Sequence, residues 1–126
     1  MDIITNGESL FKFIYKNIKL NNIKLYNVTN VGDINDSSII YFDSGDENKS
    51  LIVNNINIEN WKSNGKLIRI IGDDSNFEIK NSIIINNHSH GPLISIESKK
   101  VNIHKNNIYI LIYLLQNKLF IFSIKR

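Results

Sequence analysis

The sequence contains no cysteine and no alanine, and proline, tryptophan and methionine occur once each among its 126 residues. Without cysteine the chain can form no disulfide bond, so cysteine usage does not indicate a redox compartment. The length fits one domain, and a hydrophobic content of 42% is ordinary for a globular core. We therefore expect residues 1–126 to form a single domain without covalent cross-links.

Signals for export, for membrane insertion and for nucleic-acid binding are also missing. Residues Met1 to Thr5 lack the basic and apolar regions of a signal peptide. The apolar stretch from Ile108 to Ile124 is interrupted by polar residues before it reaches the about 20 residues of a membrane-spanning helix. The formal charge is +3, but lysines and acidic residues are interleaved along the chain. We expect no nucleic-acid partner and no membrane span, and an extracellular or cell-surface location only for a longer parent protein.

The chain also lacks the 3.6-residue apolar spacing of amphipathic helices. Apolar residues alternate instead, as in Phe77 and Ile79, which is the period of a strand. The segment from Phe77 to Ser98 recurs along the chain with a period of about 26 residues. Short strands that recur in one phase stack directly when the chain climbs one strand spacing, about 4.8 Å, per turn. The sequence therefore predicts an all-β parallel β-helix, a solenoid of about four to five coils.

The repeat sets the limits of the coils. Residues 1–22 form a partial first coil, residues 23–50, 51–76 and 77–100 form full coils, and residues 101–126 form a degenerate apolar last coil or a cap. Equivalent positions on the first strands are Ile23, Leu51, Phe77 and Val101, and on the third strands Phe13, Phe42, Ile70, Ile96 and Phe122. The first full coil is longer than the next, and we expect the surplus in the turns Val31–Ser37 and Ser44–Ser50.

The strand alternation also predicts which side chains point inward. A slip of one residue would turn every side chain to the other face, so the inward set tests the whole alignment. The predicted core contains Leu51, Val53, Ile56, Ile58, Ile68, Ile70, Phe77, Ile79, Ile84, Ile94 and Ile96.

Asparagines recur at two positions where strands end. The first column contains Asn27, Asn55 and Asn81, and a second, shorter column contains Asn60 and Asn86. A stacked side-chain amide can donate to one neighbour and accept from the other, as in the ladders of stacked sheets. Asparagine is also common in turns because it tolerates left-handed backbone. We expect a structural ladder, with the Asn81 amide buried between Asn55 and Lys105.

The pattern Phe77-x-Ile79-x-Asn81-Ser82-x-Ile84-x-Asn86-Asn87, followed by Gly91-x-Leu93-Ile94, resembles repeats of the pectin-lyase-like superfamily. It looks most like the F-x-x-N and G-G-A-I repeats of polymorphic outer-membrane-type surface proteins, with Pro92 in place of the second glycine. The resemblance covers about residues 8 to 123. It implies a right-handed single-stranded parallel β-helix and a surface protein, and it assigns no catalytic residue.

One hypothesis of enzyme function comes from the same superfamily. Polygalacturonase-type hydrolases carry Asn-Thr-Asp, Gly-Asp-Asp and Gly-His-Gly motifs, and this chain contains Asn35-Asp36, Gly72-Asp73-Asp74 and Ser89-His90-Gly91. Glycoside hydrolysis needs two carboxyl groups at one bond. Asp73 follows its strand whereas His90 precedes its strand, so we expect these motifs at different corners of the coil. Asp36 and His90 are candidates for a remnant catalytic corner.

Candidates for ligand binding are Tyr41, Arg69 and Trp61. An outward stripe on the third strands contains Lys12, Tyr41, Arg69, Ser95 and Ile121, and its mixture of aromatic and basic groups suits an acidic sugar. The opposing interpretation is that outward strand positions need no function. Trp61 lies beside Lys62, where an exposed indole would stack on a sugar, although a turn aromatic more often packs on its neighbours.

Metal binding has weaker support. His88 and His90 with His104 could ligate a metal, but no cysteine or carboxylate accompanies the turn histidines, and His104 lies about half a coil away. A calcium site would need the acidic loops at residues 43–47 and 73–74 to stack on each other. We therefore expect no metal and no cofactor.

These patterns favour a non-catalytic β-helix repeat segment, structural or adhesive, that is part of or derived from a longer surface protein. The alternative is a fragment of a carbohydrate-active enzyme, either polygalacturonase-like or a polysaccharide lyase, or a carbohydrate-binding module. The expected partners are a polysaccharide, or further copies of the chain bound through the open ends of the β-helix.

Overall fold

A computed structural model describes residues 3–5, 9–32, 37–89, 93–112 and 122–125, with side chains described in 9–32, 37–85 and 93–106. These residues form eight strands and no helix. The strands are β1 (Ile3–Thr5), β2 (Ser9–Ile14), β3 (Ile18–Asn30), β4 (Ser38–Asp43), β5 (Asn48–Ser63), β6 (Lys66–Ser89), β7 (Ile94–Ile112) and β8 (Phe122–Lys125). In this part of the chain, no helix has the length and apolar character needed to cross a membrane.

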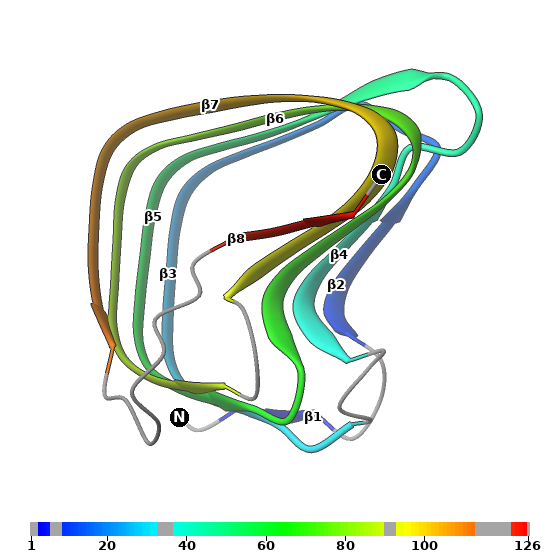
Figure 1. Ribbon diagram of the computed structural model, residues 1–126. Coiled ribbons are helices and arrows are strands. Elements are labelled where there is room, and N and C mark those ends of the chain that lie inside the picture. The colour runs from blue at the N-terminus through cyan, green and yellow to red at the C-terminus, as the bar shows by residue number, and fades with distance from the viewer. Residues whose placement is uncertain (1–2, 6–8, 33–36, 90–92, 113–121, 126) are drawn as a thin grey trace.

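Every strand pair is parallel, in the order β1-β3-β5-β6-β4-β2, with β7 paired to β6 and β8. Figure 1 shows β3, β5, β6 and β7 running side by side and bending together around the same corner. The predicted all-β parallel solenoid is therefore confirmed, and its described residues make about three turns. The sequence predicts about four to five coils because that number includes the incomplete first and last coils. The described residues cover these two coils only in part.

Asparagines at left-handed backbone positions let the long strands bend. Left-handed φ costs most L-residues about 1–2 kcal/mol, and asparagine adopts it more readily than other residues with a side chain. Each of these asparagines lies inside a long strand, so the chain turns a corner while parallel pairing continues on both sides. Among the described residues they are Asn22 (57°), Asn27 (55°), Asn55 (56°), Asn60 (56°) and Asn81 (51°).

The interior of the solenoid is filled by aliphatic and aromatic side chains. All the predicted core residues of the two central coils are buried, with exposed fractions of 3% or less. The predicted inward phase of the strands is therefore confirmed. Further core residues include Val28, Phe42, Trp61, Leu67 and Leu93.

The register of the third strands from Phe13 to Ile96 also agrees with the sequence. Phe42 pairs with Phe13 and Ile70, and Ile70 pairs with Ile96. The surplus of the first full coil lies where expected, because β3 and β4 are joined through residues 31–37 while β5 and β6 are joined through residues 64–65. The surplus is larger than expected. Asn54 lies 33 residues after its partner Asn21, whereas Asp74 lies 26 residues after its partner Asn48.

Three predicted alignments at the ends of the chain are wrong. Leu51 pairs with Ile18 instead of Ile23, Phe77 pairs with Ile103 instead of Val101, and Phe122 pairs with Ile94 instead of Ile96. A shift of two residues preserves the inward and outward phase of a strand, so alternation alone cannot distinguish these alignments. For Ile18 and Ile23 the corner at Asn22 lies between the two positions and resets the phase.

Candidate functional site

The outward face formed by β2, β4 and β6 brings Lys12, Tyr41 and Arg69 together. Tyr41 pairs directly with Lys12 on β2 and with Arg69 on β6. The Lys12 ammonium nitrogen lies 5.4 Å from the centre of the Tyr41 ring, and the guanidinium carbon of Arg69 lies 5.7 Å from it. A cation within about 6 Å of an aromatic ring is attracted by the ring's quadrupole. Tyr41 is thus contacted by cations from both neighbouring strands.

This contact changes what the stripe can recognise. The two cations compete with a sugar ring for the faces of Tyr41, so the stripe is better suited to bind an anion by charge than a sugar by stacking. Its next position, Ser95, is only 3% exposed and pairs with Ser123 of β8. The predicted last member, Ile121, lies outside the described residues. The accessible stripe therefore consists of Lys12, Tyr41 and Arg69.

Trp61 does not lie on the surface. Its side chain is 0% exposed, and its backbone pairs with Val28 and Asn87 on the neighbouring coils. The chain turns at Asn60, where φ is 56°, and the next side chain points into the core. The expected exposed indole is wrong, and Trp61 offers no face for a sugar. Its indole nitrogen is buried without a hydrogen-bond partner in the described structure, which makes it a costly group to bury.

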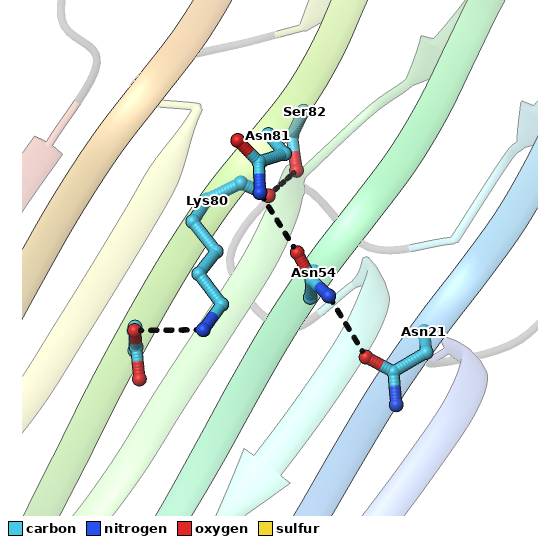
Figure 2. A network of polar contacts seen from close by, with 6 residues as sticks. Asn21, Asn54, Lys80, Asn81 and Ser82 are labelled. Atoms are coloured by element: carbon cyan, nitrogen blue, oxygen red, sulfur yellow. Dashed lines mark hydrogen bonds and ion pairs between the residues drawn. The ribbon is translucent and has the colours of Figure 1, made fainter.

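A ladder of amides crosses three strands at the corner shown in Figure 2. The amide nitrogen of Asn81 donates to the side-chain oxygen of Asn54 (3.2 Å), and the amide nitrogen of Asn54 donates to the side-chain oxygen of Asn21 (3.2 Å). Each amide therefore directs its nitrogen toward the preceding coil. All these bonds are exposed to solvent, so the expectation of a buried Asn81 amide is wrong.

Two further pairs show the same direction of donation. Asn55 donates to Asn22 over 2.6 Å, and Asn60 donates to Asn27 over 2.5 Å. The predicted columns are therefore wrong for the asparagines of β3. Asn27 stacks with Asn60 instead of Asn55, because the first coil is longer than the sequence alignment assumed. The side chain of Asn86 lies outside the described residues.

In the first predicted column, the alignment of Asn55 with Asn81 is right, but the hydrogen bond expected between them is not formed. Asn55 and Asn81 occupy equivalent backbone positions, between the paired residues Asn54–Lys80 and Asn57–Ile83. The Asn81 amide nevertheless bonds to Asn54, the residue before Asn55. Lys105 pairs with Ile79, so it does not lie over Asn81 as expected. An asparagine ladder exists, but its members differ from those that the alignment predicts.

A third column was not predicted. Asn102 donates to Asn76 over 3.0 Å, and Asn76 donates to Asn48 over 3.0 Å. Asn48 in turn donates to a carboxylate oxygen of Asp74 over 2.8 Å. The 26-residue interval between Asn76 and Asn102 equals the repeat, so the sequence contained a signal for this column.

Asn30 is a structural residue that sequence reasoning missed. It is 1% exposed, donates from its side chain to the carbonyl oxygen of Ser38 (2.8 Å) and accepts from the backbone N–H of Gly32 (2.9 Å). These bonds hold the two ends of the long turn between β3 and β4. The following coil stacks on it, since the backbone N–H of Asn64 donates to the Asn30 carbonyl oxygen over 3.1 Å. An asparagine two residues before a glycine is a weak turn signal.

The candidate catalytic residues are only partly placed. Asp36 and His90 lie outside the described residues, and the side chain of His88 does too. Asp73 forms an ion pair with Lys99 (3.2 Å), and Asp74 accepts from Asn48 (2.8 Å). Both carboxylates thus contact residues of neighbouring coils. In the described part, no group of three or more histidine, cysteine, aspartate or glutamate residues is placed to hold a metal ion.

A shallow depression of about 490 Å³ lies on β6 and β7 and is lined by Glu78, His104, Lys105 and Asn106. His104 pairs with Glu78, and its side chain is exposed. The predicted outward position of His104 is confirmed, and no further ligand-like group joins it in the described part of the chain.

Comparison of the chain with protein-family models gave no match, and comparisons with curated proteins and with solved structures gave none either.

Proposed function

We propose that this chain is a non-catalytic β-helix segment, structural or adhesive, that belongs to a longer surface protein of the polymorphic outer-membrane type within the pectin-lyase-like superfamily. The observation that carries the proposal is the bonding of Asp73 and Asp74. Their carboxylates contact Lys99 and Asn48 of neighbouring coils. They therefore tie coils together, as the amide ladders do.

The distance between corners supports the same conclusion. Residues 73 and 74 follow the third-strand segment of β6, which begins at Lys66. The turn at residues 64–65, which the sequence repeat aligns with residues 90–91, precedes this segment. About six extended residues span about 20 Å. Glycosidases place their two carboxyl groups about 5–9.5 Å apart, so a carboxylate at the Asp73 corner cannot serve a bond held at the opposite end of the third-strand segment.

Incubation of the purified chain with polygalacturonate and other uronate polymers tests catalysis. We expect no new reducing ends and no unsaturated products. Cleavage that disappears in Asp36→Asn or His90→Ala, with circular dichroism unchanged, would show that the turn before the third strand is an active site. The enzyme-fragment alternative would then replace this proposal.

A second candidate function is the binding of an acidic polysaccharide at the stripe of Lys12, Tyr41 and Arg69. The observation that favours it is the placement of two cations, from the strands on either side of β4, within about 6 Å of the centre of one aromatic ring. Lys12 and Arg69 are two strand spacings apart, about 10 Å. Such a linear array of positive charge along the solenoid axis suits a polymer with regularly spaced carboxylates.

Affinity electrophoresis in polygalacturonate, with dextran as the neutral polymer, tests this binding. We expect retardation only in polygalacturonate, with loss of retardation in Arg69→Gln and at high salt because salt screens exposed charges. Lys24→Gln is the matched control, because Lys24 is exposed on β3 and its substitution removes the same charge from another face of the solenoid. Equal losses in both variants would indicate binding by net charge alone and would contradict a site at the stripe.

A further inference from the structure

The solenoid has an open edge on β3. One side of β3 pairs with β5 from Ile18 to Asn30. On the other side, β1 pairs only with Val28–Asn30, and β2 pairs with β4. Residues 18–27 therefore have a strand on one side only within the described structure. Such an edge presents a row of backbone N–H and C=O groups that can pair with another strand.

A second open edge lies on β7. β8 pairs with β7 only from Ile94 to Glu97, while β6 pairs with β7 as far as Ile112. Residues 98–112 thus also have one neighbouring strand among the residues that are described. Figure 1 shows β3 and β7 as the outer members of the row β3, β5, β6 and β7. All four strands point in the same direction.

The amide ladders give these two edges opposite chemistry. Because the amides that bond to β3 all donate toward the preceding coil, the last amides on β3 turn their nitrogens away from the sheet, as Figure 2 shows for Asn21. Asn22 and Asn27 accept from the next coil in the same manner. Asn48 differs, since it donates to Asp74 of the following coil. At the other end, Asn102 donates to Asn76, which leaves its oxygen directed away from the preceding coil. The β3 edge therefore offers amide donors, and the β7 edge offers amide acceptors.

The register of the two edges is also complementary. Asn21, Asn54, Lys80 and Asn106 occupy one column of paired residues, and Ile18, Leu51, Phe77 and Ile103 occupy another. A second copy that continued the coil would place its Asn21 over Asn106 and its Ile18 over Ile103. The amide donor then meets an amide, and the half-buried isoleucines cover each other.

We propose that copies of this chain associate head to tail, with the β3 edge of one copy adding as a parallel strand to the β7 edge of the next. A head-to-head contact between two β3 edges would oppose donors to donors and make the strands antiparallel. A head-to-tail contact is heterologous and leaves both outer ends open, so it produces linear assemblies of increasing length. This inference concerns residues 1–126 as a separate chain and does not rest on the proposed adhesive role in a longer protein.

Lys105 opposes the contact between the β3 and β7 edges, so its substitution can test the proposal. It pairs with Ile79 and so occupies the column of Leu20, Val53 and Ile79, but its side chain is exposed. In the assembly its charged group would lie against Leu20 of the next copy. Charged side chains at inward positions of a terminal strand are one means by which natural sheets restrain edge-to-edge pairing. We therefore expect weak association that strengthens in Lys105→Ile.

Sedimentation velocity of the full chain over a wide concentration range tests the proposal. We expect an average mass that rises continuously with concentration and does not stop at a dimer. In Lys105→Ile the same mass should appear at a concentration about tenfold lower. Asn21→Asp should reduce association, because aspartate still accepts from Asn54 but lacks the donor for the next copy. Lys62→Gln, an exposed residue of β5 with the same charge change, is the control and should leave association unchanged.

The following outcomes would overturn the proposal. A single monomeric mass at all concentrations in both the natural chain and Lys105→Ile would mean that another chain segment or partner covers the edges. A mass that stops at the dimer would indicate a closed contact of two identical edges. An average mass that rises continuously with concentration but is unchanged in both Lys105→Ile and Asn21→Asp would place the contact on another surface. Circular dichroism of each variant verifies that the solenoid is intact.

Discussion

The side-chain amide of Asn60 donates a hydrogen bond to the side-chain oxygen of Asn27, one coil below it, over 2.5 Å. Both residues have left-handed backbone, with φ angles of 56° and 55°. The same side chain thus meets two requirements of a β-helix corner. It tolerates the conformation that turns the chain, and it bonds to the corner of the neighbouring coil.

These two contributions can be separated at Asn60. Glycine adopts left-handed backbone without cost but has no amide, whereas alanine loses both properties. We expect Asn60→Gly to lose at most about 0.5–1.5 kcal/mol, the usual contribution of one hydrogen bond. Asn60→Ala should lose about 1–2 kcal/mol more because of backbone strain. Urea unfolding followed by circular dichroism measures both values, and equal losses would show that the left-handed corner imposes no strain.

The inward phase of the strands follows from the sequence because burial acts on single positions. Phe77 and Ile79 alternate with Glu78 and Lys80, and only one phase buries the apolar pair. The third strands were also aligned correctly, from Phe13 to Ile96, since glycine and serine turns mark their starts. Local pattern and stacking energy agree at these positions.

Coil length follows less well from the sequence. The surplus in the first coil lies in its loops, and loops tolerate insertions without a change in strand pattern. As a result Asn27 can be aligned with Asn55 or with Asn60, and the sequence offers an asparagine at both positions. Stacking decides between them because Val28 must lie over Trp61 in the core.

The binding candidates also differ in how well the sequence predicts their positions. Tyr41 and Arg69 were expected on one outward stripe, and the register places them side by side. The ring contact with Lys12 could not be foreseen, since it depends on the rotamers of long side chains. Trp61 was misplaced because the sequence does not reveal that the corner at Asn60 turns the next side chain inward.

The burial of Trp61 gives a spectroscopic prediction. As the only tryptophan, it should show a blue-shifted emission in the folded chain and weak quenching by acrylamide, with a shift to longer wavelength on unfolding. Trp61→Ala should cost about 3–5 kcal/mol, as for other large buried side chains, and Trp61→Phe should cost less. Strong quenching of the folded protein would contradict the buried position.

Asn30 should be more sensitive to substitution than Asn64. Asn30→Ala leaves the half-buried Gly32 N–H and the buried Ser38 carbonyl without their side-chain partner, so we expect a loss of about 1–3 kcal/mol. Asn64 is half-buried, and its side chain makes one bond to the carbonyl oxygen of Gly32 over 3.2 Å. Asn64→Ala should cost at most about 1 kcal/mol. Thermal melts compare the two, and similar shifts would mean that water replaces the bonds of Asn30.

Gly65 is required by a close approach of two turns. A Cβ atom at this position would collide with the backbone oxygen and the side chain of Ser37 in the preceding coil. Backbone atoms cannot rotate away, so the coils must separate there. We expect Gly65→Ala to lose about 1–3 kcal/mol, a typical cost of overpacking. Urea unfolding measures this loss, with Asn64→Ala as the control in the same turn, and a neutral Gly65→Ala would show that the coils are not packed as described.

Asn54 lies at the centre of the ladder in Figure 2. Asn54 accepts from Asn81 and donates to Asn21, so its amide takes part in two inter-coil bonds. Asn54→Ala removes both, whereas Asn21→Ala removes only one. Because these amides are exposed and water can replace part of each bond, we expect a loss of about 1 kcal/mol for Asn54→Ala and about half of it for Asn21→Ala.

A double-mutant cycle shows whether the bonds of this ladder are coupled. If the bond from Asn54 to Asn21 is the only contact between these side chains, Asn21→Ala should add little to the loss caused by Asn54→Ala. Fully additive losses in urea unfolding would mean that the two amides act independently and that the ladder contributes no stability as a unit. Non-additivity would identify the amide columns as a source of coil-to-coil cohesion separate from the apolar core.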